Sequence, residues 1–421
     1  MRKGLVGFIA FSLLLVPTQF LNAASVKAGA SCTKLGQSQI INDYRFTCIK
    51  SGKKLVWNKG VAITKPIPTI SPSPLPSPTP KPTPTPIPIP TPLPSPNSSS
   101  FVEPTPPSNF QDLEQHIDAI PYWAWKKTRD ELNAGIPNLG NITVLIGPNT
   151  QPTQPDLKTW LEIASKLYGS FNQVKNLTVI EFAYSDIAWA ESQYQLLQDQ
   201  SWRSDYLTKA SHQCPDQRCR SAEAELNSKG DGIIMIGSIA LSDQPKDKVE
   251  NPGRYNGTQQ THEYIHTIQV VNTPNFTYAM LPQWLQEGLA MGIAQALSAN
   301  SYKEYLDLRK IDYPELISMK PSYTAEWISN FLNPHPIFEK NADNWAYWRQ
   351  FPNYRIYDIG ALTNEILTSL KGPSAVMNLY VSVGKGSTFE QAFKDIFGLS
   401  WSDANTFIAK AISLELIKMH Q

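Results

Sequence analysis

The segment Thr261-His262-Glu263-Tyr264-Ile265-His266 is the stretch that decides the fold of this 421-residue chain. On an α-helix, residues four apart lie on one face, so the imidazoles of His262 and His266 can reach the same metal ion. Glu263 projects beside them, where its carboxylate can act on a metal-bound water. Since the chain has only six histidines, this spacing seldom arises by chance. The segment therefore predicts a metal-binding helix.

A catalytic zinc site needs a third protein ligand and one position left open for water. Gln269 and Asn272 stand where a metzincin would have glycine and histidine, so that class is excluded. The better candidate is Glu287, within Leu281-Pro282-Gln283-Trp284-Leu285-Gln286-Glu287-Gly288-Leu289-Ala290. Proline suits the first turn of a helix. The glycines at 288 and 292 would let this helix approach another closely.

The motif H-E-x-x-H, followed by W-L-x-E-G-x-A, resembles the gluzincin metallopeptidases. This superfamily includes the relatives of aminopeptidase N and leukotriene hydrolase, and shorter bacterial members. The resemblance implies a zincin-like fold and a Zn²⁺ ion held by His262, His266 and Glu287. It also implies that Glu263 takes the proton of a zinc-activated water and passes it to the leaving amine. The interval of 21 residues between His266 and Glu287 is one or two longer than usual.

The resemblance covers roughly residues 230–416, less than half of the chain. Tyr357-Asp358-Ile359-Gly360 resembles a helix start whose tyrosine donates a hydrogen bond to the developing oxyanion. Tyr357 is therefore a candidate catalytic residue, with Tyr354 as the alternative. The segment from Thr388 to Trp401 resembles the closing helices of the short bacterial members.

One feature of the aminopeptidases is missing. They carry a G-x-M-E-N strand before the zinc helix, whose glutamate binds the free amine of the substrate. The corresponding stretch, residues 232–242, contains no acid before Asp243. We therefore expect an endopeptidase, with an extended substrate lying along this strand.

The fold class predicted for the main domain, residues 110–421, is α+β. Strand patterns occur at residues 141–147, 177–183 and 232–237, with helical patterns at 157–167 and 189–198 between them. Beyond Gln259 the patterns are nearly all helical, with Pro and Gly at the breaks. A sheet-bearing half followed by a helical half indicates an α+β arrangement.

Three segments precede this domain. Residues 1–24 have the basic start, short apolar run and small residues of a signal peptide. Residues 31–60 predict a small β module, with strands at 44–49 and 54–57, which resembles modules on exported actinobacterial proteins. Residues 65–108 hold 18 of the 35 prolines and predict a polyproline II linker. The protein is expected to be secreted or held at the cell surface, with the module as a tether to the envelope.

The four cysteines fit an exported chain. Their proximity in sequence predicts two local disulfides, Cys32–Cys48 and Cys214–Cys219. Two alternatives are a metal site formed by Cys214 and Cys219 with His212, and lipidation of Cys32.

The formal charge of the whole chain is +1, from 37 basic and 36 acidic side chains. This balance indicates no nucleic acid partner, and no later apolar stretch is long enough to span a membrane. The expected partner is a peptide or protein substrate. Two other functions stay open: an inactive zincin-fold binding or scaffold protein of the cell envelope, and a zinc hydrolase acting on a non-peptide substrate.

Overall fold

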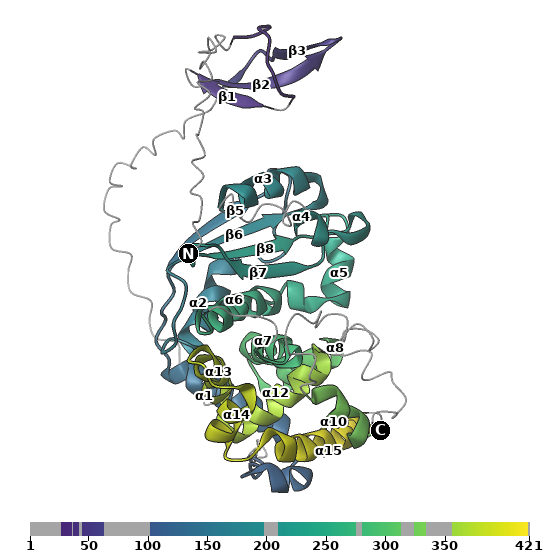
Figure 1. The fold of residues 1–421 in the computed structure, drawn as a ribbon. Helices are drawn as coiled ribbons and strands as arrows, with labels where there is room; N and C mark the ends of the chain where they lie inside the picture. Colours follow the sequence, from purple (N-terminus) through teal and green to yellow (C-terminus); the bar gives the residue numbers. More distant parts are fainter. Residues whose placement is uncertain are drawn as a thin grey trace, which may run out of the picture. The chain divides into compact units, whose positions relative to one another are not determined.

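The computed structural model describes residues 27–35, 37–41, 44–62, 102–197, 209–274, 280–312, 324–333 and 356–419. The chain divides into two compact units, a small one before Pro96 and a large one from Pro96 onward (Figure 1). The large unit combines a four-stranded sheet with many helices, which confirms the α+β class. The predicted signal peptide and most of the predicted linker lie outside the described residues. Within the described ranges, no helix is long and apolar enough to cross a membrane.

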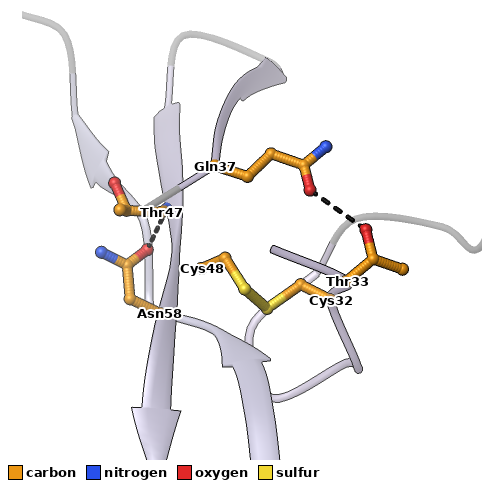
Figure 2. Close-up of a disulfide and its surroundings, with 6 residues drawn as sticks. All are labelled: Cys32, Thr33, Gln37, Thr47, Cys48 and Asn58. Carbon is orange, nitrogen blue, oxygen red and sulfur yellow. Dashed lines mark hydrogen bonds between the residues drawn. A yellow bond between two sulfur atoms is a disulfide. The ribbon is translucent and has the colours of Figure 1, made fainter. Parts of the chain in front are cut away.

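The small unit is an antiparallel sheet arranged around one central strand. That strand, β2, pairs with the other three. The strands are β1 (Ser38–Ile41), β2 (Tyr44–Ser51), β3 (Lys54–Trp57) and β4 (Val61–Ala62). The predicted disulfide Cys32–Cys48 is present (Figure 2), so the lipidation alternative for Cys32 is wrong. Cys48 is 1% exposed and its cross-strand partner Trp57 is 4% exposed. Because so short a chain buries little apolar surface, this cross-link stabilises the module.

The sheet of the large unit has the order β5-β6-β8-β7. Its strands are β5 (Asn141–Ile146), β6 (Asn176–Phe182), β7 (Ala222–Leu226) and β8 (Gly232–Gly237). The first three in space are parallel and β7 is antiparallel to β8. Side chains alternate between two faces, as a strand requires. One face packs on α2 (Leu157–Leu167) and α6 (Thr258–Val271), and the other on α3 (Ile187–Leu197).

The structure corrects the prediction that residues 232–242 form the edge along which a substrate lies. Strand β8 is hydrogen-bonded to β6 on one side and to β7 on the other, so its backbone groups are already paired. The edge strand beside α6 is β7 (Figure 1). Strand β7 was not predicted, because Ala-Glu-Ala-Glu-Leu carries few of the β-branched and aromatic residues that are typical of strands.

The second disulfide, Cys214–Cys219, is also present. It follows the short helix α4 (Lys209–His212). Both cysteines are buried against Ile233 and Met235 of the sheet. The alternative metal site at Cys214, Cys219 and His212 is therefore wrong.

Helices form the rest of the large unit. The earlier ones are α1 (Ile120–Ala134) and α5 (Gln244–Glu250). Beyond α6 come α7 (Gln283–Ser298), α8 (Tyr302–Asp312), α10 (Ala325–Leu332), α12 (Asp358–Lys371), α13 (Pro373–Gly384), α14 (Phe389–Phe397) and α15 (Trp401–Met419). Trp284 stacks on Trp401 in their core, with ring centroids 5.1 Å apart, and Phe389 packs against both. This core holds α7 in place.

The predicted close approach of the α7 helix occurs at Gly288. A Cβ atom at this position would collide with the backbone of Gly360 on α12. At Gly292 a Cβ would make only ordinary contact with Ala361, at 3.6 Å or more. The crossing therefore depends on Gly288 and Gly360, and it fixes the start of α12 beside the turn of α7 that carries Glu287.

Residues 102–108, at the end of the proline-rich stretch, contact α1. The hydroxyl of Tyr122 donates to Glu103 at 2.8 Å, and the indole of Trp123 donates to the carbonyl of Pro104 at 2.7 Å. The next segment begins with a capping box, in which Asn109 and Asp112 cap each other's backbone. The large unit thus includes the last residues of the predicted linker.

Candidate metal centre

Helix α6 carries three of the predicted site residues. It begins after Gly257, whose φ of 90° is a left-handed conformation that favours glycine. Tyr264, Ile265 and Ile268 are fully buried in the core. Their burial fixes the rotation of the helix about its axis, so His262 and His266 emerge together on the side facing α7.

The side chains of His262, His266 and Glu287 converge. The Nε2 atoms of the two imidazoles lie 2.9 Å apart. Oε2 of Glu287 lies 3.4 Å from Nε2 of His262 and 3.3 Å from Nε2 of His266. All three residues are mostly buried, with side chains 9%, 16% and 13% exposed. Within the described residues, these three form the only group of at least three His, Cys, Asp or Glu side chains whose spacing could hold a metal ion.

The donor set and its spacing fit zinc. Two imidazole nitrogens and one carboxylate oxygen are ligands that Zn²⁺ prefers, at about 2.0–2.2 Å. Atoms at that distance from a tetrahedral ion lie about 3.3–3.6 Å from one another. Two of the three separations agree, and that between the imidazoles is slightly shorter. A simple ion pair would not require both imidazoles to turn the same nitrogen toward one point.

The site brings together three ionisable side chains although it is mostly buried. Burial opposes the charged form of the Glu287 carboxyl, but His266 and His262 outweigh it and hold its pKa well below the usual value. Burial would also lower the pKa of His266, yet Glu287 raises it to about 9. The pKa of His262 is lowered by burial and by the charge on His266. The carboxylate of Glu287 is thus held ionised, which is the form that binds a cation.

Glu263 lies on the same helix but is not one of the three converging residues. It is 6% exposed, and burial raises its pKa to about 8, with smaller contributions from Glu287 and Glu223. Its carboxyl group lies beside the two histidines of the same helix, in a position to accept a proton and then release it, as a general base and then acid must.

Gln269 is a site residue that the sequence analysis did not assign. Its Oε1 accepts a hydrogen bond from Nδ1 of His266 at 2.8 Å, and its Nε2 donates to the backbone carbonyl of Gln286 at 3.0 Å. Because the amide oxygen can only accept, it fixes the proton on Nδ1 and leaves Nε2 to face the converging point. The same side chain also ties α6 to the residue before Glu287. By contrast, Nδ1 of His262 is buried without a partner among the described residues.

Replacing Gln269 by alanine is expected to weaken zinc binding by about 10–100-fold, the usual effect of losing an outer-shell partner. Competition with a chromogenic chelator measures this. Asn272→Ala is the matched control, because Asn272 is also a buried amide, directly after the end of α6, and bonds Asn172 and Ile268 but neither histidine. If both variants lost affinity equally, Gln269 would have only a structural role.

Tyr357 lies near the converging residues. It occupies the position just before the first residue of α12, and its ring centroid is 6.1 Å from that of His262. The close crossing at Gly288 and Gly360 brings this helix start to the site. Tyr354, the alternative, lies outside the described residues.

Strand β7 carries two further acids, Glu223 and Glu225. Glu223 accepts a hydrogen bond from Gln213 at 3.2 Å, and Glu225 accepts one from the hydroxyl of Tyr194. Both side chains lie on the face toward α3, whereas Ala222, Ala224 and Leu226 face the core around α6. Glu223 is nevertheless close enough to raise the pKa of Glu263. These acids were not predicted, because the strand expected at this position was residues 232–242 and not β7.

Comparison of the chain with protein-family models, with curated proteins and with solved structures finds no match. The interpretation of the site therefore rests on its own geometry and on the motif.

Proposed function

We propose that this protein is a zinc-dependent endopeptidase of the gluzincin type, with a zincin-like main domain. The observation that carries the proposal is the convergence of His262, His266 and Glu287, in which the two distances from Glu287 to the imidazoles suit one tetrahedral ion. Glu263 is next to them and is buried, as a catalytic acid–base is. His262, His266 and Glu287 would hold the ion. When bound, zinc supplies a Lewis acid that activates water at neutral pH and polarises the substrate carbonyl.

Side chains of the protein supply the proton transfer, the stabilisation of the oxyanion and the positioning of the proposed ligands. Glu263 accepts the proton of the attacking water and delivers it to the nitrogen of the leaving amine. The hydroxyl of Tyr357 donates a hydrogen bond to the oxygen of the scissile carbonyl as negative charge develops on it. Gln269 fixes the orientation of the His266 imidazole through its hydrogen bond with Nδ1. Burial of the site keeps bulk water away, which strengthens each of these interactions.

Strand β7 is the edge on which an extended substrate can lie. It runs beside α6 and, within the described residues, has a strand partner on one side only. An extended peptide can add to such an edge through main-chain hydrogen bonds. The glutamates of β7 point toward α3 and are bonded to Gln213 and Tyr194. Neither is placed to anchor a substrate amine at the metal, which favours an endopeptidase over an aminopeptidase.

The chain from residue 25 is expected to cleave internally quenched peptides that are blocked at both ends, and hardly to act on single amino-acid amides. A peptide library gives the rates, measured before and after removal of metal by a chelator and after addition of zinc. Faster cleavage of the amides, abolished by Glu223→Gln, would instead indicate an aminopeptidase that uses Glu223. If the zinc-loaded chain hydrolysed neither substrate, the protein would not be a peptidase. The alternatives would then be an inactive binding or scaffold protein and a zinc hydrolase that acts on a non-peptide substrate.

A further inference from the structure

The charge of the chain is unevenly distributed, although its total is close to zero. Residues 1–102 contain 11 basic side chains and a single acid, Asp43. Residues 103–421 contain 26 basic and 35 acidic side chains. The small module, residues 27–62, alone holds six lysines and one arginine. A strongly basic module joined to an acidic domain indicates that the two parts have different partners.

The lysines of the module are all exposed. They are Lys27, Lys34, Lys50, Lys53, Lys54 and Lys59. No acidic side chain lies among the described residues of the module, since Asp43 falls outside them. The lysines therefore have no carboxylate beside them in the described part of the module. A module with such a field attracts polyanions.

The densest group of lysines lies at the turn between β2 and β3. Lys50 is opposite Leu55, and Lys54 is opposite Ser51, so the two project from opposite faces of the hairpin. Lys53 is in the turn itself, beside Gly52, whose φ is 60°. The positive charge therefore surrounds the tip of the hairpin instead of covering one flat face.

This arrangement favours a flexible linear polymer over other polyanions. A flat bilayer would meet only one face of the hairpin at a time. A single-stranded nucleic acid would be expected to stack bases on exposed aromatic rings, but Trp57 is buried and Tyr44, 48% exposed, is the only exposed aromatic residue among those whose burial is described in the module. Lysine is also a point charge, without the planar fork with which arginine recognises particular phosphates. The interaction that best fits these exposed lysines is electrostatic attraction to a row of phosphates, without recognition of any single phosphate.

We propose that the module of residues 27–62 binds a linear phosphodiester polymer that carries no bases, of the poly(glycerol phosphate) kind. Binding would release counterions from the polymer, so it would weaken steeply as salt rises. The acidic main domain would be repelled by the same polymer and stay free of it. This inference does not depend on the peptidase function, because no residue of the module belongs to the metal centre.

The test uses the chain from residue 25 and immobilised poly(glycerol phosphate), with the dissociation constant measured at several salt concentrations. The triple variant Lys50→Gln, Lys53→Gln, Lys54→Gln is expected to bind about 100-fold more weakly at low salt. Its slope of log K against log salt should fall by about 2–3. The matched control replaces the exposed Lys175, Lys229 and Lys394 of the large unit by glutamine, which changes the net charge equally. The control should bind as the parent does.

Four results would overturn the proposal. The first is that the parent does not bind the polymer, and the second is that the control variant loses as much affinity for it as the triple variant. The third is tighter binding to vesicles of anionic phospholipid at the same phosphate concentration, and the fourth is tighter binding to single-stranded DNA. The third would make a lipid surface the partner, and the fourth a nucleic acid. Zinc content and peptide hydrolysis should be the same in all three proteins, so failure here is distinguishable from failure of the peptidase proposal.

Discussion

Glu263→Gln is expected to lower kcat for a blocked peptide by about 10²–10⁴-fold, the usual contribution of general acid–base catalysis. Glutamine has nearly the same shape as glutamate but cannot take up a proton at neutral pH. Since Glu263 is not one of the three converging side chains, the variant should still bind one zinc per chain. Steady-state kinetics and metal analysis of the same sample measure both quantities.

Glu250→Gln is the control for this experiment, because Glu250 is an exposed glutamate at the end of α5 and its carboxylate is paired with Lys246 of the same helix. It should keep the kcat of the parent. Parent-like turnover by Glu263→Gln would show that another group accepts the proton. A loss of zinc by the same variant would instead mean that Glu263 helps to hold the ion.

Removing a proposed zinc ligand is expected to have the second large effect. Glu287→Ala should raise the zinc dissociation constant more than about 100-fold, beyond the 10–100-fold range typical of outer-shell residues. The two imidazoles that remain would have to share the ion with water. His262→Ala and His266→Ala should have effects of the same order. Competition with a chelator of known affinity gives the constants.

The control is Glu162→Ala, which removes a half-exposed carboxylate from the neighbouring helix α2. It should bind zinc as the parent does. If Glu287→Ala bound zinc as tightly as the parent, the third ligand would have to be sought elsewhere, and the gluzincin assignment would lose its main support.

Much of the local structure could be predicted from the sequence. The helix predicted at residues 157–167 is α2, with the same bounds, and the strand predicted at 232–237 is β8. Both disulfides were predicted, because their cysteines are close in sequence. Cys32 and Cys48 are 16 residues apart, and Cys214 and Cys219 are 5 residues apart. These features depend on short-range patterns of apolar residues, on turns and on local cross-links, which a single stretch of chain contains in full.

The order of the strands in space could not be predicted. The interior strand β8 is more apolar than β7, and so it was the easier strand to recognise. Which of them lies at the edge depends on pairing between strands distant in sequence. Alternation of side chains says which residues share a face of a strand, but it does not say which strand is its neighbour.

The sequence by itself determined that His262 and His266 share one helical face, because 3.6 residues per turn fixes this wherever the helix lies. Only the tertiary structure decided that Glu287 meets them, that Gln269 binds both His266 and the backbone before Glu287, and that Tyr357 lies near His262. These contacts join separate helices, α6, α7 and α12. Their geometry is set by the packing of buried side chains and by the close approach of Gly288 to Gly360, and no spacing along the chain contains that information.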